Sequence, residues 1–123
     1  MALITPTITH IGNGVGQGPN GPAVLVQWTP VTEADTCDPV ELVGLPDRSV
    51  QIAGTFGSAT IVLQGSNDGT NYATLTDPQG NAISKTAAAI EMVAEVARYT
   101  KPATSGGTSS SITISMLCRR NRS

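Results

Sequence analysis

Hydrophobic and polar residues alternate in several short segments of the chain, which is the pattern of β-strands with one buried face. The most regular segment covers residues 111–118, where an apolar residue occupies every second position from Ile112 to Cys118. Because successive side chains of a strand point to opposite faces, this segment is predicted to place one apolar row against a core. The same alternation occurs in residues 23–29, 48–56 and 59–65.

The segment 23–29 also predicts the environment of the single tryptophan. Val24, Val26 and Trp28 share one face of this strand. Trp28 is therefore predicted to be a core residue rather than a surface aromatic. Pro30 is predicted to end the strand, because proline lacks the N–H group that a central strand needs for its ladder.

Turns rich in Gly, Asn and Pro separate these segments. The Gly-Ser pair at 57–58 is predicted to form a type II′ hairpin turn between its flanking strands. The run Asn-Asp-Gly-Thr-Asn at 67–71 predicts a sharp reversal, and residues 77–81 predict a turn with Pro78 in its second position. The first run is rich in oxygen ligands, but Asp68 is its one carboxylate. Calcium sites usually hold several carboxylates, so a hairpin turn is the preferred interpretation.

Three segments fit strand periodicity less clearly. Residues 87–99 match helical and strand spacing equally well, and their β-rich surroundings favour extended structure. Residues 99–103 predict a strand at a sheet edge, because Pro102 interrupts it. Residues 32–45 are acidic and interrupted by proline, and they are predicted to form a loop with a short strand at 40–43.

Together these segments predict a single all-β domain. About seven short strands, with turn signals about every ten residues, are typical of an antiparallel β-sandwich or a jelly-roll-like fold. The length of 123 residues suits one domain. We expect an N-terminal strand or arm with a Gly-rich loop at 1–22, a β-sandwich domain at 23–118 and a basic C-terminal tail at 119–123.

Charge and cysteine content exclude several functional classes. The net charge is −2, and seven Lys and Arg residues are too few for a broad nucleic-acid-binding surface. No apolar run approaches the ~20 residues of a membrane helix, and the start lacks a secretory signal, so we expect a chain that is made and remains in a cytoplasm. Cys37 and Cys118 have no metal-ligand spacing. Cys118 is expected to be a small buried hydrophobe, and a disulfide between the two stays an open alternative.

The sequence offers little for catalysis or cofactor binding. His10 is the single histidine and has no nucleophile-elbow pattern beside it. Glu91 and Glu95 fit a solvated face better than an acid/base pair. Residues 16–21 match G-x-G-x-x-G in letters, but a strand follows this loop, whereas pyrophosphate binding needs a strand before it and a helix after it. We therefore predict a chain without enzymatic activity, metal or cofactor.

The middle and C-terminal sequence resembles small structural proteins of tailed phages. The resemblance is carried by residues 49–72, above all the run Gln-Gly-Ser-Asn-Asp-Gly-Thr-Asn at 64–71, and by shorter matches at 75–77, 98–99, 101–102, 106–108 and 112–114. It covers about residues 48 to 120. The resemblance implies a β-sandwich on the capsid surface of a virion, a head decoration (cement) protein that binds the major capsid protein lattice as a homotrimer. A tail or head–tail connection protein and a host-surface carbohydrate-binding module are the alternatives.

Two segments are the candidate contacts with a protein partner. Leu3, Ile4 and Ile8 lie in the N-terminal segment, which is either the first strand of the sandwich or an arm that adds a strand to a neighbouring subunit. Three arginines lie at the C-terminus. They form either a solvated tail or an electrostatic contact with an acidic partner surface. The arginines are Arg119, Arg120 and Arg122.

Overall fold

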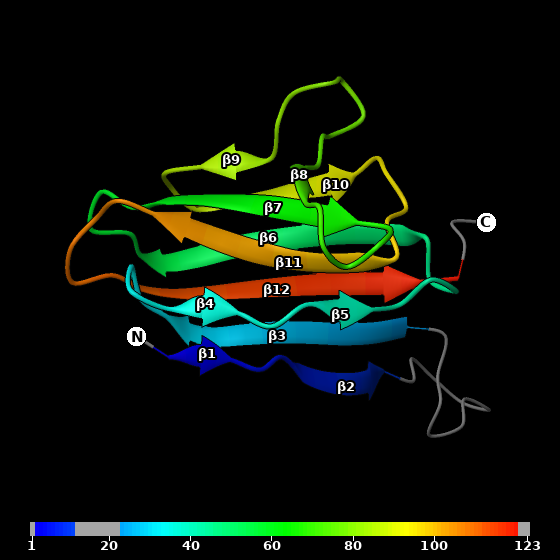
Figure 1. Ribbon diagram of the computed structural model, residues 1–123, viewed down its shortest axis with the longest axis horizontal. Helices are drawn as coiled ribbons and strands as arrows, with labels where there is room; N and C mark the ends of the chain where they lie inside the picture. Colours follow the sequence, from blue (N-terminus) through cyan, green and yellow to red (C-terminus); the bar gives the residue numbers. More distant parts are fainter. Residues whose placement is uncertain (1, 12–22, 121–123) are drawn as a thin grey trace.

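The chain folds into two antiparallel β-sheets that pack face to face. The computed structural model describes residues 2–11 and 23–120, and every regular element in these residues is a β-strand. Both main sheets have five strands (Figure 1). The prediction of an all-β sandwich is therefore confirmed.

The first sheet, called the β12 sheet here, is built around the C-terminal strand. β12 pairs along its length with β6 on one side and β3 on the other, and β10 and β2 form the edges. In spatial order the strands are β10 (Ala89–Val93), β6 (Asp47–Thr55), β12 (Ser111–Arg119), β3 (Ala23–Val31) and β2 (Thr7–Ile11).

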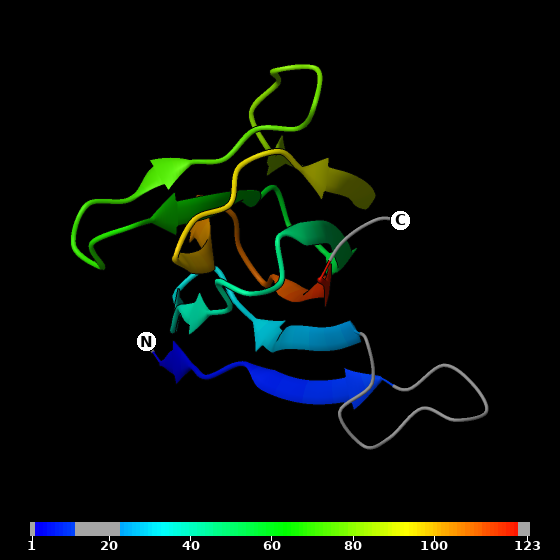
Figure 2. The same ribbon diagram turned by 90° about the vertical axis from the view of Figure 1, so that its right-hand side faces the viewer.

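The second sheet, called the β7 sheet, covers the inner face of the first. Its strands in spatial order are β5 (Val40–Glu41), β11 (Tyr99–Ser105), β7 (Thr60–Ser66) and β8 (Ala73–Thr74), with β9 (Ser84–Lys85) also paired to β7. A short parallel pair joins β1 (Leu3–Ile4) to β4 (Thr36–Cys37). Figures 1 and 2 show β1 and β2 along one margin of the molecule beside β3, and the β8–β9 connection projecting from the opposite margin.

The core lies between the sheets and contains the apolar rows that the alternation predicts. Trp28 is fully buried, and its indole N–H donates a hydrogen bond to the Asp38 carbonyl at 2.8 Å. Full burial of one such large apolar side chain contributes roughly 1.5–3 kcal/mol. The other rows on the inner faces are Val24 and Val26; Val50 and Ile52; Ile112, Ile114, Met116 and Cys118; and Ala59, Ile61 and Leu63.

The predicted hairpin at residues 57–58 is wrong. Gly57 and Ser58 both have positive φ angles, 56° and 70°, whereas a type II′ turn has a positive φ at its first central residue alone. The Ala59 N–H donates to the Phe56 carbonyl at 2.8 Å and closes the turn. The strands on either side do not pair, because β6 lies in the β12 sheet and β7 in the β7 sheet. The turn therefore carries the chain from one layer of the sandwich to the other.

The predicted end of the strand at Pro30 is also wrong, since β3 continues to Val31. The register changes here from Trp28 opposite Ile114 to Val31 opposite Ile112. Two residues of β3 thus face one residue of β12, which is a β-bulge. A bulge interrupts the ladder, so it accommodates proline, and it returns Val31 to the core, where the side chain is fully buried.

Two of the less regular segments form the strands β10 and β11. Residues 89–93 form strand β10, which confirms the extended alternative for this part of 87–99. Pro102 lies in β11 opposite Leu63, beyond the two residues that pair with β5. The Leu63 N–H and carbonyl bond to Ile83 and Leu75 on its other side, so Pro102 occupies a position where no N–H is needed. The edge character predicted for this strand is confirmed at Pro102.

One cation is buried at the end of the sandwich where β6 begins. Arg48 is 2% exposed, and no described acidic residue forms an ion pair with it. Its guanidinium instead donates to the carbonyls of Leu45 (2.8 Å), Ala97 (3.3 Å) and Leu42 and to the Thr100 hydroxyl (3.2 Å). Burial lowers the pKa of Arg48. This side chain joins the loop before β6, the loop before β11 and β11 itself.

Candidate docking surface

The outer face of the β12 sheet is a broad surface of small polar and apolar side chains. The strand register places its outward residues in cross-strand rows. One row contains Gln27, Ser115, Gln51 and Ile90, and the next contains Leu25, Leu117, Ser49 and Met92. Side chains that lie opposite one another on one face of a sheet contact each other, so these rows form a continuous surface.

Hydrogen bonds between neighbouring strands hold the polar side chains of this surface in place. The Gln27 amide donates to the Ser115 hydroxyl at 3.0 Å, and the hydroxyls of Thr29 and Thr113 are 2.6 Å apart. Exposed apolar side chains lie beside them: Ile90 is 65% exposed and Leu117 is 38% exposed. A rigid surface of this composition is suited to packing against another protein, because few groups must be ordered or desolvated on binding.

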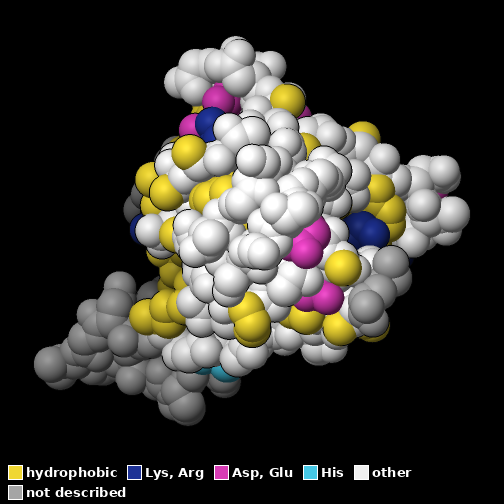
Figure 3. All heavy atoms as spheres, turned by 90° about the vertical axis from the view of Figure 1, so that its left-hand side faces the viewer, with side chains coloured by type: hydrophobic (Ala, Val, Ile, Leu, Met, Phe, Trp, Pro, Cys, Tyr) yellow, Lys and Arg dark blue, Asp and Glu magenta, His cyan; other side chains and the backbone are white. Residues whose placement is uncertain are grey.

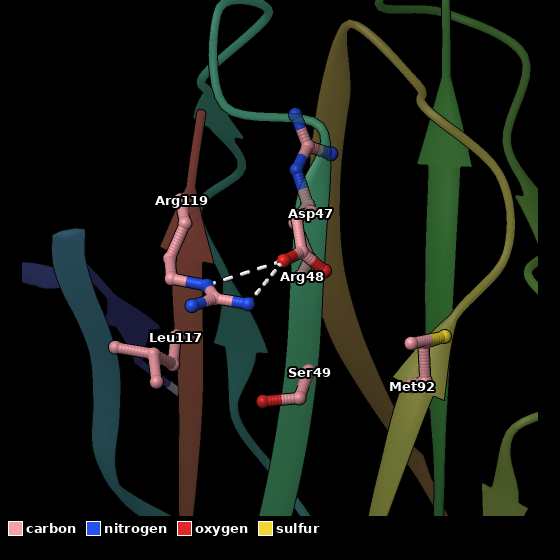
Figure 4. Close-up of a pocket in the computed structure, with 6 residues that line it drawn as sticks. All are labelled: Asp47, Arg48, Ser49, Met92, Leu117 and Arg119. Carbon is pink, nitrogen blue, oxygen red and sulfur yellow. Dashed lines mark hydrogen bonds and ion pairs between the residues drawn. The ribbon is translucent and has the colours of Figure 1, made fainter. Parts of the chain in front are cut away.

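The charged residues of this face in the described strands lie in one row at its end. Arg119 donates from Nε (3.1 Å) and Nη2 (2.7 Å) to the same carboxylate oxygen of Asp47, as Figure 4 shows. The Arg119 side chain is 48% exposed and the Asp47 side chain 12%. Arg120 follows and is exposed. With two cations to one carboxylate, this end of the face carries an excess of positive charge.

Two shallow cavities adjoin the charged row. The first has a volume of about 260 Å³ and is lined by Asp47, Arg48, Ser49, Met92, Leu117 and Arg119 (Figure 4). The second, of about 400 Å³, shares Asp47 and Met92 with the first and adds Pro46, Pro78 and Arg120. Together they place apolar walls next to exposed guanidinium groups. A partner with an aliphatic side chain next to a carboxylate would fit this arrangement.

The two groups of residues that the sequence predicted as partner contacts, the C-terminal arginines and the N-terminal apolar residues, lie in different parts of the structure. Arg119 is the last residue of β12 rather than the first of a tail, and Arg120 follows it at the basic end of the face. Arg122 and the Gly-rich loop at 12–22 lie outside the described residues. The N-terminal residues lie on the opposite margin of the sheet, where Leu3 is 60% and Ile8 47% exposed and Ile4 packs against the core.

Sequence patterns did not identify the other residues of this outer face, called the docking face from here on. Asp47, Leu117 and Met92 come from three strands, and the Asp47–Arg119 ion pair joins residues 72 positions apart. Alternation alone marks Leu117 as outward on its strand. The partner strands, and hence the cavity, follow only from the pairing of β12 with β6 and of β6 with β10.

Hydrogen bonds within the turn at 67–71 already use the oxygen atoms of its carboxylate. β7 and β8 pair on either side of it, which confirms the predicted reversal. Asp68 accepts from the N–H groups of Thr70 and Asn71 (both 2.8 Å), the Asn71 amide (2.9 Å) and the Ser66 hydroxyl (2.8 Å). These donors, the Asn71 and Thr70 N–H groups foremost, hold the pKa of Asp68 well below its usual range. The carboxylate therefore fixes the turn.

The remaining reactive groups are bound within the fold or dispersed. Cys37 and Cys118 are free, buried thiols, and burial raises the pKa of each to about 11. Glu91 forms an ion pair with Lys85 at 2.7 Å, and Glu95 accepts from the Thr76 N–H at 2.8 Å. In residues 2–11 and 23–120, no three His, Cys, Asp or Glu side chains are grouped to hold a metal ion.

Comparison with known proteins adds no family to this picture. A scan of the chain against protein-family models gives no match, and a search of curated proteins gives none either. Among the described residues there is no helix long and apolar enough to cross a membrane.

Proposed function

We propose that the chain is a non-enzymatic structural protein of a tailed-phage virion, which docks on the major capsid protein lattice through the outer face of the β12 sheet. The observation that carries the docking function is the sparsely charged face itself. Ordered Ser, Thr and Gln side chains of β3 and β12 share this face with exposed Ile90 and Leu117, and the cavities lie beside Arg119. The assignment to a capsid rests on the resemblance of residues 48 to 120 to phage decoration proteins.

From the same resemblance we propose that the chain forms a homo-oligomer on the outside of the phage head. In decoration proteins this oligomer is a trimer. A structural role asks for a stable scaffold and an accessible contact surface. The buried rows of both sheets supply the scaffold, and the outer face of the β12 sheet supplies the surface. A position in the tail or at the head–tail connection would use the same face on a different lattice.

Carbohydrate binding has less support from the geometry. Trp28, the largest aromatic side chain, is fully buried and bonded to the Asp38 carbonyl. Lys101 lies 4.5 Å from the ring centroid of Tyr72, and Arg98 lies 5.0 Å from that of Tyr99. These cations occupy one face of each tyrosine ring. Stacking on a sugar needs an open aromatic face, so the docking proposal is preferred.

Capsids from virions that lack this chain provide the test. Leu117→Asp places a charge on the outer face of the β12 sheet, and Val43→Asp is the matched control, because Val43 is 56% exposed and lies outside this sheet. We expect wild type and Val43→Asp to co-sediment with capsids and Leu117→Asp to bind at least tenfold more weakly, since a buried apolar contact is replaced by a charge that must be desolvated. Equal binding by both variants, or no binding by wild type at low and moderate salt, would overturn the proposal. Gold labelling of intact virions then distinguishes head from tail.

A further inference from the structure

The two edges of the β12 sheet differ in how they are protected. The β10 edge lies against a neighbouring segment: Lys85 of β9 pairs with Glu91 at 2.7 Å, and the Ala94 N–H donates to the Thr76 carbonyl at 2.9 Å. Contacts of this kind hinder the approach of a further strand. Natural proteins protect sheet edges in such ways because bare edges associate.

The β2 edge has none of these devices in the described residues. β2 pairs with β3 on one side, and no described strand pairs with its other side. Its sequence, Thr-Ile-Thr-His-Ile, contains no Lys, Asp, Glu or Pro, and four of its five residues are exposed. Ile8 is 47% exposed and Leu3 of β1 is 60% exposed on the same margin. Figure 3 shows separate hydrophobic side chains in the lower half of one end of the molecule.

We propose that β2 pairs antiparallel with β2 of a second copy of this chain across a two-fold axis, so that two β12 sheets become one continuous sheet. A second copy fits this edge for two reasons. A strand without Lys, Arg, Asp or Glu carries no fixed charge to repel its own image, and an antiparallel pair of identical strands is self-complementary under two-fold symmetry. The register that overlaps all five residues places Thr9 opposite Thr9 of the other copy and Ile8 opposite His10 of the other copy. Each exposed Ile8 then gains a cross-strand neighbour.

The geometry of such a dimer has a consequence for docking, which rests on the proposed function. The two-fold axis of an antiparallel strand pair is perpendicular to the sheet. The outer faces of both copies therefore point to the same side. A dimer would present two docking faces to one lattice, and the second contact would form at a high effective concentration. This two-fold dimer is an alternative to the trimer that the resemblance implies, and the mass of the protein in solution distinguishes the two.

The mass of the purified protein and its charge variants test the pairing. We expect wild type to have the mass of a dimer by light scattering at micromolar concentration. Thr9→Lys sets two cations against each other at the axis and should weaken the dimer at least tenfold. Thr74→Lys on β8 is the matched control, because Thr74 is an exposed residue of a strand in the other sheet, and it should remain dimeric. A monomer or trimer for wild type, or an undiminished dimer for Thr9→Lys, would overturn the pairing.

A cross-link tests the register. Directly opposed residues of antiparallel strands have Cα atoms about 4.5–5.5 Å apart, within the range of about 4.4–6.8 Å that a disulfide spans. Thr9→Cys should therefore form a covalent dimer under mild oxidation, whereas Thr74→Cys should not, and the native cysteines are buried. Cross-linking of Thr9→Cys no faster than Thr74→Cys would contradict this register. Neither experiment involves capsids, so failure of the dimer is distinguishable from failure of the docking function.

Discussion

The inner and outer faces of the β12 sheet are formed by the same strands, but each holds an arginine in a different environment. On the inner face Arg48 is buried and donates to three carbonyls and one hydroxyl. On the outer face Arg119, from the strand beside it, is half exposed and pairs with Asp47. Arg48 and Asp47 are consecutive residues, so the strand alternation alone sends one side chain into the core and the other to the surface. The inner arginine is committed to the fold, and the outer one is available for a partner.

The two arginines also differ in what they contribute to stability. A buried cation without a described carboxylate partner depends on every one of its hydrogen bonds, because water is excluded and the charge has been desolvated. An exposed ion pair competes with water and contributes little to stability. The inner face therefore determines whether the sandwich folds, whereas the outer face contributes less to its stability.

The largest expected effect follows the removal of the inner guanidinium. Arg48→Ala removes four hydrogen bonds and the links between the loops before β6 and β11. We expect the free energy of unfolding to fall by about 3 kcal/mol or more, as measured by urea denaturation.

A second variant at this position separates packing from hydrogen bonding. Arg48→Met retains an apolar stem of similar length but donates no hydrogen bonds. If the polar contacts dominate, Arg48→Met should remain clearly less stable than wild type. If Arg48→Ala lowers the free energy of unfolding by less than about 1 kcal/mol, Arg48 contributes no more than an ordinary surface residue. The contrast between the inner and the outer arginine would then be wrong.

A smaller effect is expected at Asp68, which is exposed and yet densely hydrogen-bonded. Its pKa is lowered in the folded state, so its stabilisation is present above the usual value of about 4 and is lost as the pH falls below it. Asp68→Asn should have a lower melting temperature than wild type at pH 7, and the two should converge between about pH 4 and pH 2. An equal difference at pH 7 and pH 2 would show that charge plays no part in fixing this turn.

The smallest effect on stability is expected at the outer arginine. Arg119→Ala should lower the free energy of unfolding by between about 0 and 1 kcal/mol, the usual range for an exposed ion pair. The free energy of capsid binding should fall by more than the free energy of unfolding in this variant. The gap in binding between wild type and Arg119→Ala should shrink as the salt concentration is raised. A stability loss equal to that of Arg48→Ala would show that both faces serve the fold.

Much of the architecture was accessible from the chain alone. The alternation from Ile112 to Cys118 correctly assigned each residue to a face, and the same reasoning placed Trp28 in the core. The turn chemistry of residues 67–71 correctly gave a reversal between paired strands. These predictions succeeded because side-chain direction along a strand and the φ angles of a tight turn are local properties.

Pairing between strands was decided only by the tertiary structure. The turn at 57–58 looks like a hairpin locally, but both edges of β6 are occupied by β10 and β12, so β7 joins the other sheet. The bulge at Thr29 and Pro30 depends on the register of β12 against β3. The Asp47–Arg119 pair and its adjoining cavity likewise exist only once distant strands lie side by side. Local sequence sets which way a side chain points, whereas its neighbours depend on hydrogen-bond ladders between segments that are far apart along the chain.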